Sequence, residues 1–140
     1  MNNLKRAENI LKNGGFTCVC CNDTETLTSH KRGVASLLEW LDSDINLKEF
    51  SVADKVIGKG AAFLYIMLKI KELHANVISR SAFETLTKYN IPVTYDVLTE
   101  AIRNRDNTGF CPIETAVSEI TDPDTAVSVI RETLGHIQKS

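Results

Sequence analysis

One short segment of the chain combines charged side chains with residues that have almost no side chain. Asp54, Lys55 and Lys59 supply one carboxylate and two ammonium groups, and Gly58 and Gly60 lie beside them. If a helix begins here, its free N–H groups and partial positive charge suit a phosphate, which the ammonium groups would neutralise. Asp54 would accept from a ribose hydroxyl, and the glycines would admit the ligand. The structural alternative is that small residues allow close helix–sheet packing while the charges are solvated or paired.

Two later segments carry polar groups that would complete such a pocket. Asn104 and Arg105 lie in the most polar loop, where an arginine can hold a phosphate or carboxylate through two parallel hydrogen bonds. Glu114 follows Pro112 in the first turn of an expected helix. The alternatives are a turn-forming asparagine with exposed charges, and a glutamate that only caps its helix. We predict that Arg105 and Glu114 join the charged segment at one site.

Lys59 and Cys111 are candidate nucleophiles. A lysine amine that is desolvated among small apolar residues can form covalent adducts. Cys111 stands before Pro112 at an expected helix start, where the helix dipole favours a thiolate. No spacing places a histidine base beside Cys111, and we favour the structural interpretation of Cys111 as a partly buried side chain.

Three cysteines lie close together near the N-terminus. Cys18 and Cys20 share one face of an expected strand, and Cys21 points to the other face. His30 on the paired strand makes a metal site geometrically conceivable. Cysteine is, however, among the most buried residue types, so we favour packing in the core and expect no metal.

Composition favours one soluble domain spanning residues 1–140. Hydrophobic residues make up 43% and charged residues 24%, which are ordinary values for a globular protein. A net charge of −2 gives no electrostatic footprint for nucleic acid. The longest apolar run, residues 60–68, is far shorter than the roughly 20 residues of a membrane-spanning helix. No apolar leader opens the sequence, so we expect a cytoplasmic protein whose cysteines stay as thiols.

Hydrophobic periodicity and turn residues predict the order α, β-hairpin, α, α, β, α, β, α, α. Single helices between strands imply parallel neighbours, and the hairpin adds an antiparallel edge. The fold class is therefore α/β, with a mixed sheet between helical layers. The expected helices cover 4–14, 33–42, 51–73, 81–90, 112–120 and 123–138; the strands cover 16–21, 24–29, 75–79 and 93–97, with a short helical turn at 98–102.

The long helix over residues 51–73 is expected to be central. Ser51 and Asp54 have the spacing of a capping box, which marks a helix start. Residues 60–68 are apolar on every side, and a helix of that kind is buried by other elements.

Three ordered motifs resemble domain-of-unknown-function family 1893. They are residues 53–62 (ADKVIGKGAA), 102–105 (IRNR) and 109–114 (GFCPIE). The resemblance covers most of the chain and implies a cytidine-deaminase-like, three-layer α/β/α fold. The family has no established biochemical activity, so the resemblance implies an architecture and a set of residues without a reaction.

The zinc site of a deaminase is missing from this sequence. Such a site needs a histidine or cysteine ligand with a glutamate at one helix start, and Pro-Cys-x-x-Cys at the next. Here the first helix start reads Gly58-Lys59-Gly60 and the second, at 79–83, reads SRSAF. We therefore predict no catalytic zinc and no cofactor.

The leading hypothesis is a zinc-free protein that binds a nucleotide or a related phosphorylated small molecule. One alternative is an enzyme that uses Lys59 or Cys111 as its nucleophile. Another is an oligomeric or partner-binding module that makes contact through Trp40 and the terminal helices. We expect no binding to nucleic acid or membranes.

Overall fold

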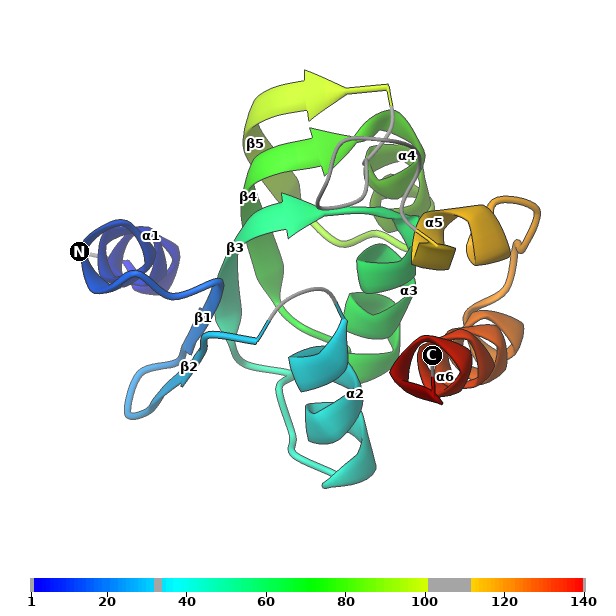
Figure 1. Cartoon of the computed structure of the whole chain (residues 1–140). Helices are drawn as coiled ribbons and strands as arrows, with labels where there is room; N and C mark the ends of the chain where they lie inside the picture. Colours follow the sequence, from blue (N-terminus) through cyan, green and yellow to red (C-terminus); the bar gives the residue numbers. More distant parts are fainter. Residues whose placement is uncertain (1, 32–33, 101–111, 140) are drawn as a thin grey trace.

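The computed structural model describes residues 2–31, 34–100 and 112–139 (Figure 1). Six helices and five strands follow one another in these segments. In chain order they are α1 (Asn3–Gly14), β1 (Cys18–Cys21), β2 (Thr26–Ser29), α2 (Ala35–Asp42), β3 (Ser51–Ile57), α3 (Lys59–Leu68), β4 (Glu72–Ser79), α4 (Arg80–Lys88), β5 (Val93–Thr99), α5 (Pro112–Val117) and α6 (Pro123–Lys139).

The described strands form one mixed sheet in the order β2-β1-β3-β4-β5. β1 is antiparallel to both of its neighbours, and Cys18 stands directly opposite Asp54 of β3. β3, β4 and β5 are parallel, because each connection between them passes through a helix. The carboxyl ends of β3 and β4 therefore lie at the same edge of the sheet as the first turns of α3 and α4.

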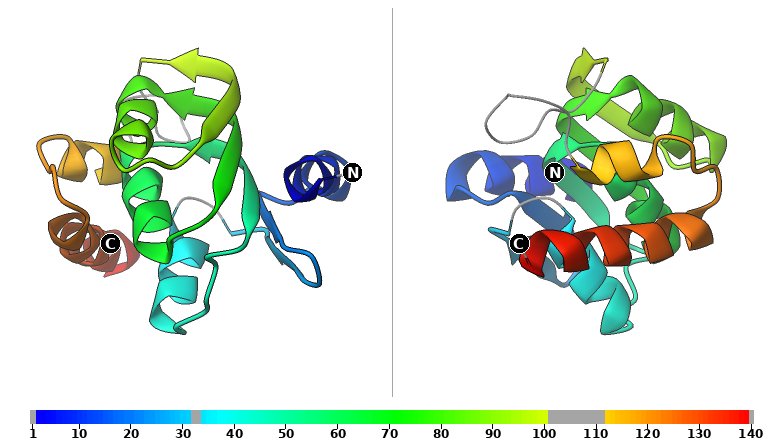
Figure 2. Two further views of the ribbon diagram at one scale, coloured as in Figure 1. Left: turned by 180° about the vertical axis from the view of Figure 1, so that it is seen from behind. Right: turned by 45° about the vertical axis from the view of Figure 1, so that its right-hand side comes forward.

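Helices cover the two faces of the sheet unequally (Figures 1 and 2). Among the described helices, α1 is the one that covers the first face, over β1 and β3, while α2, α3 and α4 lie on the other face. α6 packs against α3 and α5, outside the helical layer. The prediction of a mixed sheet flanked by helices is confirmed.

The main core lies between the sheet and α3. α3 is buried almost throughout, and its Phe63, Leu64 and Tyr65 side chains are at most 1% exposed. This confirms the prediction that residues 60–68 are buried by other elements. A smaller core, which includes Ala7 and Leu11 of α1, fills the space on the opposite face. No helix among the described residues has the length and apolar character needed to cross a membrane.

The expected helix start at Ser51–Asp54 is wrong, because residues 51–57 form the strand β3. Ser51 does not cap a helix; its hydroxyl donates to the Glu72 carboxylate at 2.5 Å. β3 is hydrogen-bonded on both sides, by β1 and β4, and this pairing outweighs the local capping pattern. The sheet consequently has five described strands where the sequence pattern predicted four.

The structure also corrects three element boundaries. α3 ends at Leu68 and not at residue 73, because Lys69 adopts a left-handed conformation with φ of 58° that closes the helix. β5 continues through Leu98 to Thr99 where a helical turn was expected. α5 ends at Val117, three residues before the predicted limit of 120.

Candidate functional site

The first turn of α3 is capped by a carboxylate from a distant part of the chain. Glu114 Oε1 accepts from the Lys59 backbone N–H at 2.7 Å, and Glu114 Oε2 accepts from the Gly60 backbone N–H at 2.9 Å. Gly58, the N-cap residue of α3, has no side chain that could do this. A negative charge at this end of a helix is stabilised by the free N–H groups and by the helix dipole. Glu114 therefore occupies the place that an external anion would take.

The two glycines provide the space for this contact. A Cβ atom on Gly58 would lie 2.4 Å from Glu114 Cδ, and one on Gly60 would lie 2.5 Å from Ile113 Cγ2. Gly58 has a φ of −100°, which any residue can adopt, so the requirement is for space and not for backbone freedom. The room that we expected the glycines to leave for a ligand is filled by α5.

Lys59 completes a reciprocal connection between α3 and α5. Its ammonium group donates to the Ser118 carbonyl at 3.0 Å, just beyond the last residue of α5, and lies 5.7 Å from the centre of the Phe63 ring. A cation is favoured at the C-terminal end of a helix for the same reason that an anion is favoured at its start. Glu114 and Lys59 together hold the two helices at both ends of α5.

The remaining predicted site residues lie apart from this connection or outside the described segments. Lys55 is exposed on β3, where its backbone N–H donates to the Thr17 carbonyl at 3.1 Å. No described contact joins its ammonium group to Lys59. Asn104, Arg105 and Cys111 lie outside the described residues.

Asp54 belongs to a second group of polar side chains, inside the sheet–helix layer. The Tyr65 hydroxyl of α3 donates to Asp54 Oδ2 at 2.5 Å, and the Val56 backbone N–H donates to Oδ1 at 3.2 Å. Tyr65 Oη also lies 3.1 Å from Cys18 Sγ of β1. The side chains of three different elements thus form one hydrogen-bonded chain, which we call the Asp54–Tyr65–Cys18 chain. The sequence pattern did not predict it, because Tyr65 was assigned to the core and β3 to a helix.

Burial controls the ionisation of this chain. Loss of solvation raises the pKa of Asp54 to about 7, although the bonds from Tyr65 and from the backbone oppose the change. The hydrogen bond with Cys20, followed by burial, raises the pKa of the Cys18 thiol. Burial, followed by the Asp54 charge, raises the pKa of Tyr65. At neutral pH the phenol and the thiol are therefore neutral, and only the carboxyl exchanges its proton.

The direction of the hydrogen bonds follows the charge on Asp54. When the carboxyl is ionised, the Cys18 thiol donates to the Tyr65 oxygen and the Tyr65 hydroxyl donates to the carboxylate. When the carboxyl is protonated, it can donate to the Tyr65 oxygen, and the hydroxyl turns toward sulfur. The chain can thus take up or release one proton near neutral pH without breaking a contact between heavy atoms.

The start of α4, beside that of α3, is also satisfied by the protein's own groups. Ser79 Oγ accepts from the Ala82 backbone N–H at 3.1 Å, as expected of an N-cap serine. Arg80 pairs with Glu100 through Nε at 3.0 Å and Nη2 at 2.7 Å. The helices that follow β3 and β4 therefore both begin with charged groups that already have partners within the protein.

The cysteines of β1 are packed side chains. Cys18, Cys20 and Cys21 are free thiols and at most 3% exposed, as the packing interpretation predicted. His30, the histidine considered as a metal ligand, packs against Phe16 with its ring tilted by 41° and a ring-centre distance of 4.6 Å. Within the described segments no group of three or more histidine, cysteine or acidic side chains is arranged to hold a metal ion.

A polar pocket of about 240 Å³ lies at the opposite end of the sheet, where the loops enter β3 and β4. It was not anticipated from the sequence. Its lining residues are Asn3, Asn22, Asp23, Thr24, Glu49 and Lys71.

These features define an α/β protein with a five-stranded mixed sheet flanked by helices and a self-capped helix at the end of its central strand. Residues 6–134 match the model of the TM1506 family, a domain of unknown function (DUF1893), and the chain belongs to this family. The fold is similar to the crystal structure of a DUF1893 family protein (TM1506) from Thermotoga maritima at 2.70 Å resolution, with a TM-score of 0.84 and 27% sequence identity. That likeness covers 96% of this chain and 89% of the other. A comparison with curated proteins finds no match.

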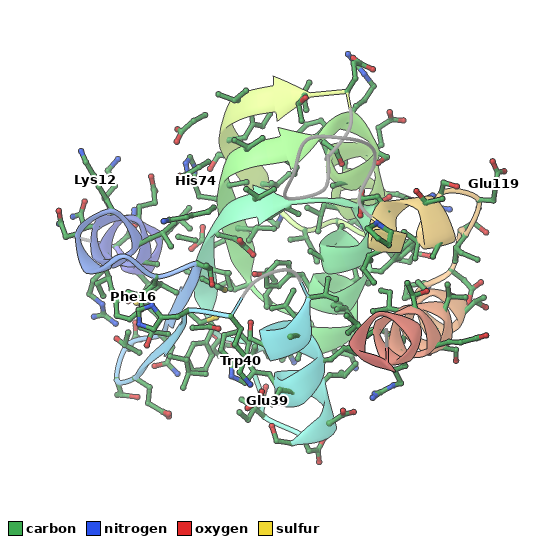
Figure 3. The ribbon with its side chains drawn as sticks, viewed as in Figure 1. Lys12, Phe16, Glu39, Trp40, His74 and Glu119 are labelled. Carbon is green, nitrogen blue, oxygen red and sulfur yellow. The ribbon has the colours of Figure 1, made fainter. Side chains whose placement is uncertain are left out.

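Replacing Glu114 by glutamine should destabilise the protein by about 1 to 3 kcal/mol, because an amide offers one acceptor oxygen where the carboxylate offers two, and it carries no charge. Chemical denaturation of the Glu114→Gln variant and the parent protein would measure the loss. Glu119→Gln is the matched control, since Glu119 is exposed and projects outward past the end of α5 (Figure 3). Equal stabilities of the two variants would show that Glu114 does not hold α3.

The pKa of Asp54 should make stability fall as pH rises. The folded protein binds the Asp54 proton with a pKa of about 7, whereas the unfolded chain binds it near 3.9, so stabilisation by the protonated carboxyl is complete below about pH 4 and is lost through about pH 7. For this half-buried group we expect a total of about 2 to 4 kcal/mol.

The Asp54→Asn variant isolates this contribution, because its amide cannot titrate. Relative to the parent protein, it should gain stability progressively between about pH 5 and pH 7 in chemical denaturation experiments. Asp124→Asn, at an exposed position in the first turn of α6, should show a constant difference from the parent over the same range. A constant difference for Asp54→Asn as well would contradict the raised pKa.

Proposed function

We propose that this protein binds a nucleobase-containing small molecule where β3 and β4 end and α3 and α4 begin, on a deaminase-like fold without zinc chemistry. In open α/β sheets, ligands generally bind outside the carboxyl ends of parallel strands. Here β3 and β4 end side by side, and Gly58 and Ser79 start the helices that follow them. The order of the strands, with an antiparallel β1 beside three parallel strands, supports the deaminase-like arrangement.

The Glu114 carboxylate at the start of α3 is the observation that carries this proposal. Each of its oxygens accepts one backbone N–H, and each keeps further acceptor capacity. Glu114 is half-buried, so a ligand can approach it from the solvent. A carboxylate held in this way attracts N–H donors and repels phosphate. The ligand's amide or amino groups would therefore face Glu114, and any phosphate would lie away from α3.

This assignment changes the roles that the sequence pattern suggested. Lys59 would position Glu114 through its bond to the Ser118 carbonyl and would not neutralise a phosphate. Arg105 and Asn104 keep their proposed role in ligand binding, and Lys55 is an exposed cation three residues before Gly58. No histidine or cysteine stands at either helix start, in 58–60 or 79–83, so a deaminase-type zinc has no ligands there.

The Asp54–Tyr65–Cys18 chain supports a second candidate, an enzyme that uses Asp54 in acid–base chemistry. A carboxyl group with a pKa of about 7 can both donate and accept a proton at neutral pH. Asp54 is half-buried at the centre of β3, four residues before the N-cap of α3. The earlier candidates Lys59 and Cys111 would act as nucleophiles that form a covalent bond with the substrate. Acid–base chemistry at the Asp54–Tyr65–Cys18 chain requires no such bond.

Thermal-shift measurements with matched nucleobases, nucleosides and nucleoside monophosphates would test the proposal. A base or nucleoside that carries N–H donors should raise the melting temperature of the parent protein at millimolar concentration. Adding a 5′-phosphate should not strengthen binding, because the Glu114 carboxylate repels the phosphate and keeps it away from the N–H groups at the start of α3.

Glu114→Gln provides the residue-specific control. It should weaken binding by about 10-fold or more, the loss expected for a charge-assisted hydrogen bond, and Glu119→Gln should leave binding unchanged. The proposal fails if no base, nucleoside or nucleotide shifts the melting temperature. It also fails if monophosphates bind and Glu114→Gln binds them as tightly as the parent protein.

A further inference from the structure

β5 (Val93–Thr99) is a seven-residue strand at one edge of the sheet. Within the described part of the chain no strand lies beyond β5 in the sheet. The opposite edge strand, β2, has only four residues. Natural proteins usually protect a long edge with proline, lysine or a bulge, since unpaired backbone groups readily pair with another strand. β5 (VTYDVLT) contains neither proline nor lysine.

The phase of the backbone shows which groups face the open edge. The Pro92 carbonyl accepts from the Leu73 N–H of β4 at 3.0 Å, so the backbone groups of residue 92 point toward β4. Successive residues of a strand direct these groups alternately to its two sides. The N–H and C=O groups of Val93, Tyr95 and Val97 consequently point away from β4. Pro92, which has no N–H, is not among the residues whose backbone groups face the open edge.

The side chains along this edge are unusually apolar for an exposed strand. Tyr95 is 40% exposed and Val97 is 53% exposed. Tyr95 touches Phe83 of α4 edge-on, with ring centres 5.6 Å apart, and this contact fixes the orientation of its ring. An exposed apolar edge strand of this kind is suited to pairing with another strand.

The sequence of the edge is complementary to itself. When two copies of β5 run antiparallel about a two-fold axis at Tyr95, Val93 of each copy stands opposite Val97 of the other. The backbone N–H and C=O groups of these residues face the open edge in both copies. Tyr95–Tyr95 and both Val93–Val97 combinations therefore become hydrogen-bonded pairs. Asp96 then stands opposite Thr94, and no like charges face one another.

His74 places hydrogen-bonding groups beside this edge. In each chain its Nδ1 lies 2.7 Å from Thr94 Oγ1, and its Nε2 lies 3.3 Å from Asp96 Oδ1. His74 belongs to β4, and its side chain lies on the face of the sheet that carries α1, with Nε2 3.7 Å from Glu8 Oε1 (Figure 3). Pairing about Tyr95 would bring the Asp96 carboxylate of one copy toward the Thr94–His74 pair of the other.

We propose that a second copy of this chain pairs with β5, joining the two five-stranded sheets into one continuous sheet. The inference does not rest on the proposed function, because it uses the edge farthest from β1 and not the starts of α3 and α4. It also differs from an interface through Trp40, which is half-buried against the main core (Figure 3). The self-complementary register favours an identical partner over an unrelated extended peptide.

Sedimentation of the full-length chain over a range of concentrations tests the proposal. The parent protein should pass from one chain of 15.5 kDa to a discrete species of twice that mass. Val97→Lys should raise the dimer dissociation constant by about 10-fold or more, because an edge lysine opposes pairing. Val56→Lys is the matched control, since Val56 is 48% exposed but lies on the central strand β3; its dissociation constant should not change.

Oxidative cross-linking tests the register. Tyr95→Cys should form an intermolecular disulfide, since directly paired Cα atoms lie about 5.5 Å apart, within disulfide range. Val97→Cys should not, because each residue 97 stands opposite residue 93. A protein that stays monomeric at all concentrations, or a dimer that survives Val97→Lys and does not cross-link through Tyr95→Cys, would overturn the proposal.

Discussion

The contact between the Glu114 carboxylate and the start of α3 organises the helical side of this protein. α3 is buried almost throughout, so the N–H groups of its first turn need partners from the protein. Gly58 cannot supply one, and Glu114 reaches back over 54 positions to do so. This contact, with the return bond from Lys59 to Ser118, docks α5 on α3 and so brings α6 against the same helix. If a side chain beside α3 in the sequence had capped this helix, α5 would lack its hydrogen bonds from Glu114 to α3.

The same requirement for burial explains the Asp54–Tyr65–Cys18 chain. β3 is the third of five strands, and α3 covers it, so a polar side chain there must find its partners inside the protein. Tyr65 and Cys18 provide them, and the surroundings hold at most one negative charge near neutral pH. The two polar groups of α3, at its first turn and at Tyr65, thus differ in character. The first is a fixed charge, and the second exchanges a proton.

Local sequence signals predicted the elements whose formation depends on neighbours in the chain. The hairpin of β1 and β2 and the burial of residues 60–68 were anticipated. The helix start expected at Ser81 lies slightly earlier, because Ser79 is the N-cap residue of α4. The signals failed at residues 51–57. The spacing of Ser51 and Asp54 is typical of a helix cap, but the segment forms a strand because it pairs with β1 and β4. Glu114 and the glycines were assigned to one site, but the sequence could not show that the carboxylate itself fills the space beside Gly58. Contacts of this kind depend on the packing of distant helices, which no local pattern encodes.

The account depends most on whether Glu114 is the resident anion of the α3 start. The backbone amide signals of Lys59 and Gly60, followed by NMR while inorganic phosphate is added, report this directly. With Glu114 in place these two signals should stay unchanged up to millimolar phosphate, while nearby amides serve as internal references. A saturable shift of both signals in the parent protein would mean that the helix start is open to external anions, and it would contradict the role assigned to Glu114.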